Sequence, residues 1–167
     1  VAGTYTVAYD VSDTAGNTAT QETRTVIVEA AFDDTASLAV TGIDAVKTYA
    51  IADDTYDNGW SWTFNVTVPT NETQFQVKFA DFVSGGNTIT ATNNIRFYSA
   101  QASGNATSAT AVEIIAANTY SSAITLDSDL APATAGRQIE VTVEIKVPTG
   151  SVGGSYSAQY GVQSNPI

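Results

Sequence analysis

The chain of 167 residues contains no cysteine, no histidine and no methionine, and only 14% of its residues are charged. Without cysteine and histidine it has no disulfides, no thiol nucleophile, no Ser-His-Asp triad and none of the usual zinc or haem ligands. A run of about 18 apolar residues, the length that a membrane-spanning helix needs, is also missing. These absences remove most familiar enzyme classes and predict no membrane span.

Basic residues are scarce as well. Six lysines and arginines stand against 17 acidic residues, which gives a formal net charge of −11. This charge repels polyphosphate, so neither nucleic acid nor an anionic membrane surface is an expected partner. Hydrophobic residues make up 43% of the chain, enough to bury a core. A surface rich in threonine, serine and asparagine with few charges is typical of bacterial extracellular proteins, so we expect an extracellular or cell-surface location.

What the sequence does have is strict alternation of apolar and polar residues, the period of a half-buried β-strand. Runs of this kind cover residues 60–68, 75–79, 139–147 and 156–162. Pro69 ends the first run, since proline cannot donate to a strand ladder. Short strands separated by turn residues predict an all-β protein with an antiparallel two-layer sandwich. The pattern also predicts that the runs at 60–68 and 75–79 pair as a hairpin.

The alternation lapses once, and this lapse divides the chain. Residues 1–29 read as two strands joined by a loop rich in glycine, asparagine and aspartate, which is the pattern of a β-hairpin. Residues 30–36 show neither the strand nor the helix period, which predicts a linker. Residues 37–167 then form the predicted sandwich.

The first hairpin carries a recognisable motif, GTYTVAYDVSDTAGNTAT at 3–20 followed by RTVIV at 24–28. It resembles the last two strands of bacterial immunoglobulin-like repeats on surface proteins, which implies a hairpin from an incomplete immunoglobulin-like domain before an immunoglobulin-like sandwich. The stretches WTFNVTVPTNET at 62–73 and ATAGRQIEV at 133–141 resemble the β-rich C-terminal region of predicted surface proteins of uncultivated, reduced-genome bacteria. Both resemblances imply a location outside the cell, and neither implies an activity.

A two-stranded hairpin is marginal on its own in water, so it must pack on something. Three alternatives are open: further strands precede it outside this sequence, it joins the sheet of the sandwich, or it completes a neighbouring subunit by strand addition. The third would build a polymer, because unreciprocated head-to-tail donation does not close.

Calcium is the one metal for which the sequence offers ligands of a suitable type. Oxygen-bearing side chains cluster in a single turn before Gly59, at Asp53, Asp54, Asp57 and Asn58. Their spacing differs from an EF-hand, and an Asx-type turn explains the same residues without a metal. Asp10, Asp13 and Asn17 form a second cluster of this kind in the hairpin loop.

Trp60 and Trp62 could form a stacking platform for a sugar ring, which would make a surface glycan a possible ligand. They share their strand face with Phe64, Val66 and Val68, however, and an unbroken apolar face is typical of a core. We therefore expect the two tryptophans in the core. The same alternation predicts that Tyr156 and Tyr160 are buried.

Glu140 and Glu144 are the carboxylates whose pairing would suit glycoside hydrolysis. They lie four residues apart on the polar face of one strand, about 13 Å apart along it, which is too far for the usual acid-base pair. We therefore expect no enzyme and no obligatory cofactor.

The leading hypothesis is a non-catalytic structural or assembly module of a bacterial surface protein, such as an S-layer, filament or adhesin stalk, which self-associates into an oligomer or polymer. The alternative is a sandwich that binds a carbohydrate or a calcium-dependent ligand.

Overall fold

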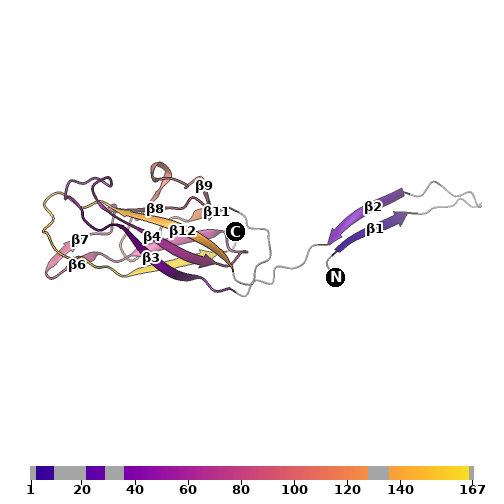
Figure 1. Ribbon diagram of the computed structural model, residues 1–167, viewed down its shortest axis with the longest axis horizontal. Helices are drawn as coiled ribbons and strands as arrows, with labels where there is room; N and C mark the ends of the chain where they lie inside the picture. The colour runs from indigo at the N-terminus through magenta and orange to yellow at the C-terminus, as the bar shows by residue number, and fades with distance from the viewer. Residues whose placement is uncertain (1–2, 10–21, 29–35, 128–135, 166–167) are drawn as a thin grey trace, which may run out of the picture. The chain divides into compact units, whose positions relative to one another are not determined.

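The computed structural model describes residues 3–9, 22–28, 36–127 and 136–165 (Figure 1). The chain divides into two compact units, Val1–Phe32 and Asp33–Ile167. The described elements are strands apart from one short 3₁₀ helix, and the ladders that join them are antiparallel. The prediction of an all-β, antiparallel protein is confirmed. In these residues no helix has the length and apolarity to cross a membrane.

The first unit contains a two-stranded sheet. Strands β1 (Gly3–Tyr9) and β2 (Glu22–Val28) pair in continuous register, from Gly3 opposite Val28 to Tyr9 opposite Glu22. On one face of this sheet Thr6, Ala8 and Thr25 are exposed. The predicted calcium cluster at Asp10, Asp13 and Asn17 lies outside the described residues, as does most of the predicted linker, 30–35.

The second unit is a sandwich of two sheets, with strand orders β10-β8-β12-β4-β3 and β13-β5-β11-β9. We call them the five-stranded and the four-stranded sheet. The five-stranded sheet is made of β3 (Ala39–Lys47), β4 (Trp60–Val68), β8 (Ile95–Tyr98), β10 (Val112–Glu113) and β12 (Arg137–Ile145). The four-stranded sheet is made of β5 (Gln74–Phe79), β9 (Ala102–Ser103), β11 (Ile124–Leu126) and β13 (Tyr160–Asn165). A small hairpin, β6 (Phe82–Ser84) with β7 (Asn87–Ile89), and the 3₁₀ helix η1 (Ser108–Thr110) complete the unit.

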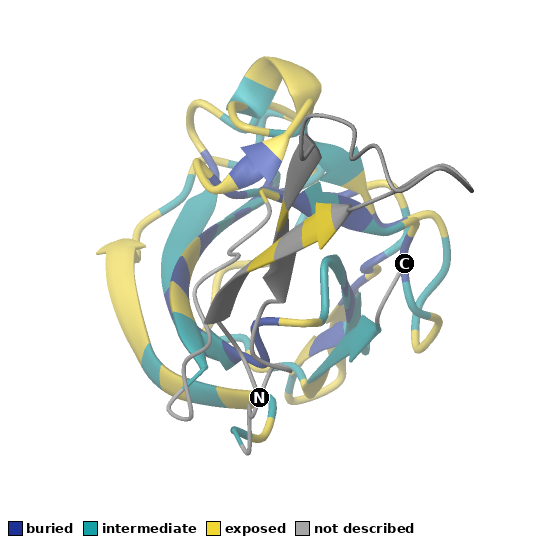
Figure 2. Ribbon diagram, turned by 90° about the vertical axis from the view of Figure 1, so that its right-hand side faces the viewer, coloured by how far each residue is buried: buried dark blue, intermediate teal, exposed yellow. Residues whose placement is uncertain are grey.

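The core lies between the two sheets (Figure 2). Strands β4 and β12 pair along their whole length, from Val68 opposite Arg137 to Trp60 opposite Ile145. Because side chains alternate across a strand, the apolar residues of both strands enter the core while threonine, asparagine and glutamate face solvent. Burying each valine, isoleucine or phenylalanine contributes about 1.5–3 kcal/mol, so this alternation drives the two sheets together. The fully buried side chains of β4 and β12 include Val66, Val68, Val141, Val143 and Ile145.

The predicted hairpin between β4 and β5 is wrong, because these strands belong to different sheets. Pro69 ends β4, a turn closed by the Glu72 amide and the Pro69 carbonyl follows, and the chain then crosses to the opposite layer. Phe64 and Phe79 meet across the core with ring centroids 6.2 Å apart. Two neighbouring strands with one apolar face each can pair edge to edge or stack face to face, and the alternation is the same in both cases.

The end of the chain also differs from the prediction. The last strand begins at Tyr160, not at Tyr156. Tyr156 is half-buried, and Tyr160 is 40% exposed where the alternation predicted burial. Tyr160 lies on β13, the edge strand of the four-stranded sheet, and an edge position leaves one flank of an inward side chain uncovered.

Candidate functional site

The predicted calcium loop, residues 53–58, is held together by its own hydrogen bonds, and we call it the acidic loop. One carboxylate oxygen of Asp53 accepts from the Thr55 amide at 3.0 Å and the Thr55 hydroxyl at 2.7 Å. The other accepts from the Asn58 side-chain amide at 2.7 Å. These donors, Thr55 first and then Asn58, lower the pKa of Asp53, because they stabilise its charged form. The arrangement is that of an Asx turn closed by a second side chain.

The other acidic residues of the loop have separate roles. Asp54 has a left-handed backbone (φ 61°), and its carboxylate accepts from the Thr149 amide at 3.1 Å. Hydrogen bonding to Thr149, first to its side chain and then to its amide, lowers the pKa of Asp54. The Asp57 carbonyl accepts a hydrogen bond from the Lys47 ammonium group. The loop is thereby tied to the end of β3 and to the segment that follows β12.

The loop therefore brings Asp53 and Asn58 together but directs Asp54 to a different partner. Within the described part of the chain no group of three or more acidic side chains could hold a metal ion. Calcium binding by this loop stays a prediction.

Trp60 and Trp62 are both half-buried, so they belong neither wholly to the core nor to the open surface. Their ring centroids are 6.4 Å apart and their planes are tilted by 48°. Trp60 also lies 6.3 Å from Phe82 and 5.8 Å from Tyr156. The two rings pack on core residues with one side and border open space with the other, and their tilt does not form a flat platform.

The open space beside the tryptophans consists of two adjoining hollows, each of about 200 Å³, which share Thr48, Trp60, Gly154 and Tyr156. Tyr49, which is 79% exposed, lines the first hollow, and Trp62 lines the second. We call these six residues the aromatic groove. Among the described residues that line both hollows, none is acidic or basic. The aromatic groove is thus neutral in a chain of net charge −11.

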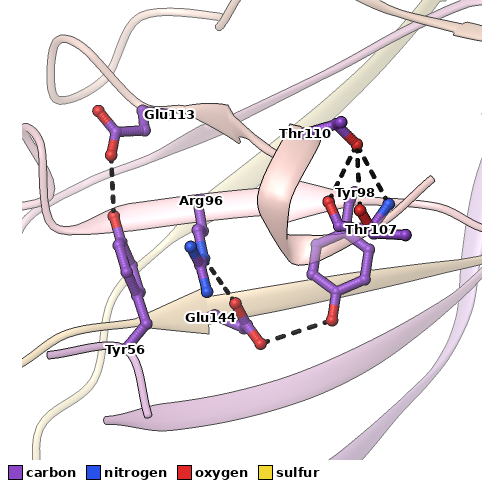
Figure 3. Close-up of polar contacts among 7 residues, drawn as sticks. All are labelled: Tyr56, Arg96, Tyr98, Thr107, Thr110, Glu113 and Glu144. Atoms are coloured by element: carbon purple, nitrogen blue, oxygen red, sulfur yellow. Dashed lines mark hydrogen bonds and ion pairs between the residues drawn. The ribbon is translucent and has the colours of Figure 1, made fainter. Parts of the chain in front are cut away.

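A polar cluster that the sequence did not predict lies on the outer face of the five-stranded sheet (Figure 3). Arg96 on β8 and Glu144 on β12 are directly opposite in register and form an ion pair, with Nε and Oε2 2.6 Å apart. The Tyr98 hydroxyl donates to the other oxygen of Glu144 at 3.4 Å. At η1, the Thr110 hydroxyl accepts from the Thr107 amide at 3.3 Å and donates to the Thr107 carbonyl at 3.2 Å.

Tyr56, from the acidic loop, covers this ion pair. The Arg96 guanidinium lies 4.0 Å from the centre of the Tyr56 ring, and the Lys146 ammonium lies 5.2 Å from it. The Tyr56 hydroxyl donates to Glu113 at 3.5 Å. Burial, and next the Glu113 charge, raise the pKa of Tyr56 to about 12, so the phenol stays protonated at neutral pH. Burial raises the pKa of Tyr98 as well.

The cluster fastens the acidic loop to the sheet, and its charges are already partnered. Alternation placed Glu144 on a polar strand face, but nothing in the sequence states which strands are neighbours, so its pairing with Arg96 could not be derived. Of the two carboxylates considered for catalysis, Glu144 is engaged by Arg96 and Glu140 faces solvent.

Comparison with known proteins identifies no family. No protein-family model matches the chain, and no curated protein matches it in sequence. One similar solved structure is a family 123 glycoside hydrolase from Clostridium perfringens, with 14% identity and a TM-score of 0.44. The match covers 78% of this chain and 25% of that protein. A similarity of this size assigns no activity to this chain.

The ion pair can be tested against a matched control on the same strand. Replacing Glu144 by alanine leaves Arg96 and Tyr98 without their acceptor, and we expect it to lower the free energy of unfolding by about 1 kcal/mol. Glu140→Ala removes an exposed carboxylate from β12, and we expect a change within about 0.5 kcal/mol. Urea unfolding measures both, and equal losses would contradict the role of the ion pair.

The lowered pKa of Asp53 predicts acid sensitivity. A carboxylate with a depressed pKa in the folded state stabilises the fold above its ordinary value of 3.8 and loses this effect as the pH falls through its folded pKa. We expect Asp53→Asn to have a lower melting temperature at neutral pH and a smaller further decrease between about pH 5 and pH 2. Asp57→Asn, which leaves the backbone carbonyl of that residue in place, is the control and should retain the acid sensitivity of the original chain.

Proposed function

We propose that this chain is a non-catalytic structural module of a bacterial cell-surface protein, acting through its sandwich and through contacts between subunits. The observation that carries the proposal is the open pair of strand edges on one side of the sandwich. Strand β3 ends the five-stranded sheet and β13 ends the four-stranded sheet. Ile43 on β3 is 45% exposed, and Tyr160 on β13 is 40% exposed. Apolar side chains at unpaired edges favour association.

The causes of the pKa shifts support a role without catalysis. Catalytic acids and bases combine a perturbed pKa with a cleft that admits a substrate. Here the pKa shifts of Asp53, Asp54 and Tyr56 arise from turn hydrogen bonds and from packing on the sheet. Among the described residues that line the aromatic groove, tyrosine is the only titratable type.

An extracellular location fits the same proposal. The absence of cysteine and methionine and the low proportion of charged residues are the composition on which this expectation rests. The resemblance of residues 3–28 to surface immunoglobulin-like repeats points the same way. A stack of β-sandwiches suits a stalk or lattice, because many backbone hydrogen bonds act together to hold neighbouring strands.

The native size of the purified chain tests the proposal. We expect light scattering after size exclusion to detect species larger than the 17.4 kDa monomer, growing with concentration, and negative-stain images to show polymers. We expect a calcium chelator to leave the assembly intact, because Asp53 and Asn58 are already hydrogen-bonded within their loop. A monomer at every concentration would contradict an assembly role, and dissociation by the chelator would assign calcium to it.

The aromatic groove supports a second candidate function, the binding of a neutral glycan. Its walls combine the rings of Tyr49, Trp60, Trp62 and Tyr156 with the hydroxyl group of Thr48, and charged side chains are absent from its described lining. Apolar ring faces with a few polar groups are the usual content of a ligand pocket. An uncharged ligand is the one that such a lining would select.

Tyr49 provides the test, because it is exposed and its removal spares the core. In a titration of tryptophan fluorescence with neutral oligosaccharides, we expect Tyr49→Ala to weaken binding about tenfold, the size of one lost aromatic contact. Ile115→Ala, at a residue that is 68% exposed and lies outside the lining of both hollows, should bind as the original chain does. If none of the oligosaccharides binds, this candidate is excluded.

A further inference from the structure

The two sheets of the sandwich differ in width, and the difference falls at the β3 edge. Strand β4 lies across the core from β13, where the rings of Phe64 and Tyr160 meet edge to face with centroids 4.9 Å apart. Strand β3 continues the five-stranded sheet beyond β4, whereas the four-stranded sheet ends at β13. Among the described residues no strand lies next to β13 on the side opposite β5.

The inner face of β3 is consequently uncovered. In register Ile43 lies beside Phe64, and Ala45 lies beside Trp62, so both point to the same side of the sheet as the core residues. Phe64 is buried, yet Ile43 is 45% exposed and Ala45 is also exposed. In Figure 2 most of β3 has the colour of exposed residues. The inner face of β3 is apolar and exposed because, in the described part of the chain, the four-stranded sheet has no strand opposite it.

A groove occupies the place of that strand. It has a volume of about 210 Å³ and is lined by Ile43, Trp62, Phe64, Phe79 and Tyr160, among others. None of the described residues in its lining carries a charge. We call it the edge groove, to distinguish it from the aromatic groove, with which it shares Trp62 and Tyr156.

Strand β13 itself contains none of the charges, prolines or bulges that normally block pairing, and two of its residues, Val162 and Ser164, are hydrogen-bonded to Tyr120 and Glu72 of neighbouring segments. Tyr160–Asn165 contains no proline and no charged residue, and it pairs with β5 without a register shift. Natural edge strands are usually protected by charges, prolines or bulges. Strand β3 has such protection, since its register is interrupted between Val40 and Gly42 and again between Ala45 and Lys47. The β13 edge is therefore the one suited to accept a strand.

We infer that β13 accepts strand β1 from the hairpin of a second copy of this chain, which inserts beneath β3 and fills the edge groove. The inference rests on the proposed assembly function and names its joint. Strand β1 has seven residues against six in β13, and neither strand carries a charge. Tyr5, Val7 and Tyr9 occupy alternate positions of β1, the spacing that an apolar groove requires of an added strand.

Geometry favours the hairpin of the second copy, rather than its sandwich, as the partner of β13. If two sandwiches joined through their β13 edges, the β4 strand of one copy would need the space that β3 of the other occupies. A two-stranded sheet has no second layer and meets no such obstacle. It also gains by joining, because two strands alone are marginal in water. Each copy would give its hairpin to one neighbour and receive a hairpin from another, and such a head-to-tail contact builds a filament wherever its rotation does not close into a ring.

The test compares two charged substitutions on β3 in the full chain. Ile43→Lys places an ammonium group in the edge groove, while Val46→Lys adds the same charge to a residue of β3 outside the groove lining. In light scattering we expect the Ile43→Lys chain to remain at the monomer mass of 17.4 kDa and the Val46→Lys chain to assemble as the original does. Assembly of both variants would overturn the inference and leave the proposed function standing, whereas an original chain that stays monomeric would end both.

Disulfide trapping gives a second measurement that does not depend on how Ile43→Lys folds. The chain has no cysteine of its own. Cysteine is placed at Gln163 on β13 and, in three separate chains, at Thr4, Thr6 or Ala8 on β1, because only directly opposed residues of paired strands come close enough to bond. We expect one of the three chains to form a ladder of covalent multimers on a non-reducing gel. An internal disulfide within monomers, or no disulfide in any of the three, would overturn the inference.

Discussion

Much of the molecule depends on the ladder between β4 and β12. Its two strands run side by side from Trp60 opposite Ile145 to Val68 opposite Arg137, and their inward residues form the middle of the core. Strand β8 is added on one side of this pair and β3 on the other. A one-residue slip in the ladder would turn the buried residues of the displaced strand to solvent, so its register determines which residues of β4 and β12 face inward.

The same ladder determines where the acidic loop lies. Gly59 precedes β4, and a Cβ atom at this position would come within 1.9 Å of the Ile145 carbonyl oxygen, so only glycine allows the loop to close on the end of β12. Asp54 then reaches the Thr149 amide, and Tyr56 lies over Arg96. The acidic residues thus have a structural explanation in turn geometry and loop attachment. Hydrogen bonds lower the pKa values of Asp53 and Asp54, and burial raises that of Tyr56.

Unequal sheets give the sandwich its distinctive surface. A five-stranded layer over a four-stranded one leaves the inner face of β3 without cover, and the half-buried aromatic residues gather at that side. Trp60 and Trp62 therefore have two roles, since they complete the core and also border the open grooves. Both proposals, assembly through a strand edge and binding of a neutral ligand, draw on this one asymmetry.

Alternation in the sequence was enough to predict the all-β class, the long strands β4 and β12 and the inward direction of residues such as Val66 and Val141, because strand period depends on local residues alone. Which strands pair, and which side chains form ion pairs, depended on the tertiary structure. Alternation is the same whether β5 pairs beside β4 or stacks across from it, and it cannot identify Arg96 as the neighbour of Glu144. It also predicted Tyr160 as buried, since it does not reveal which strand is last in a sheet. Edges, grooves and ion pairs arise from contacts between segments distant in sequence, and only the assembled sheets decide them.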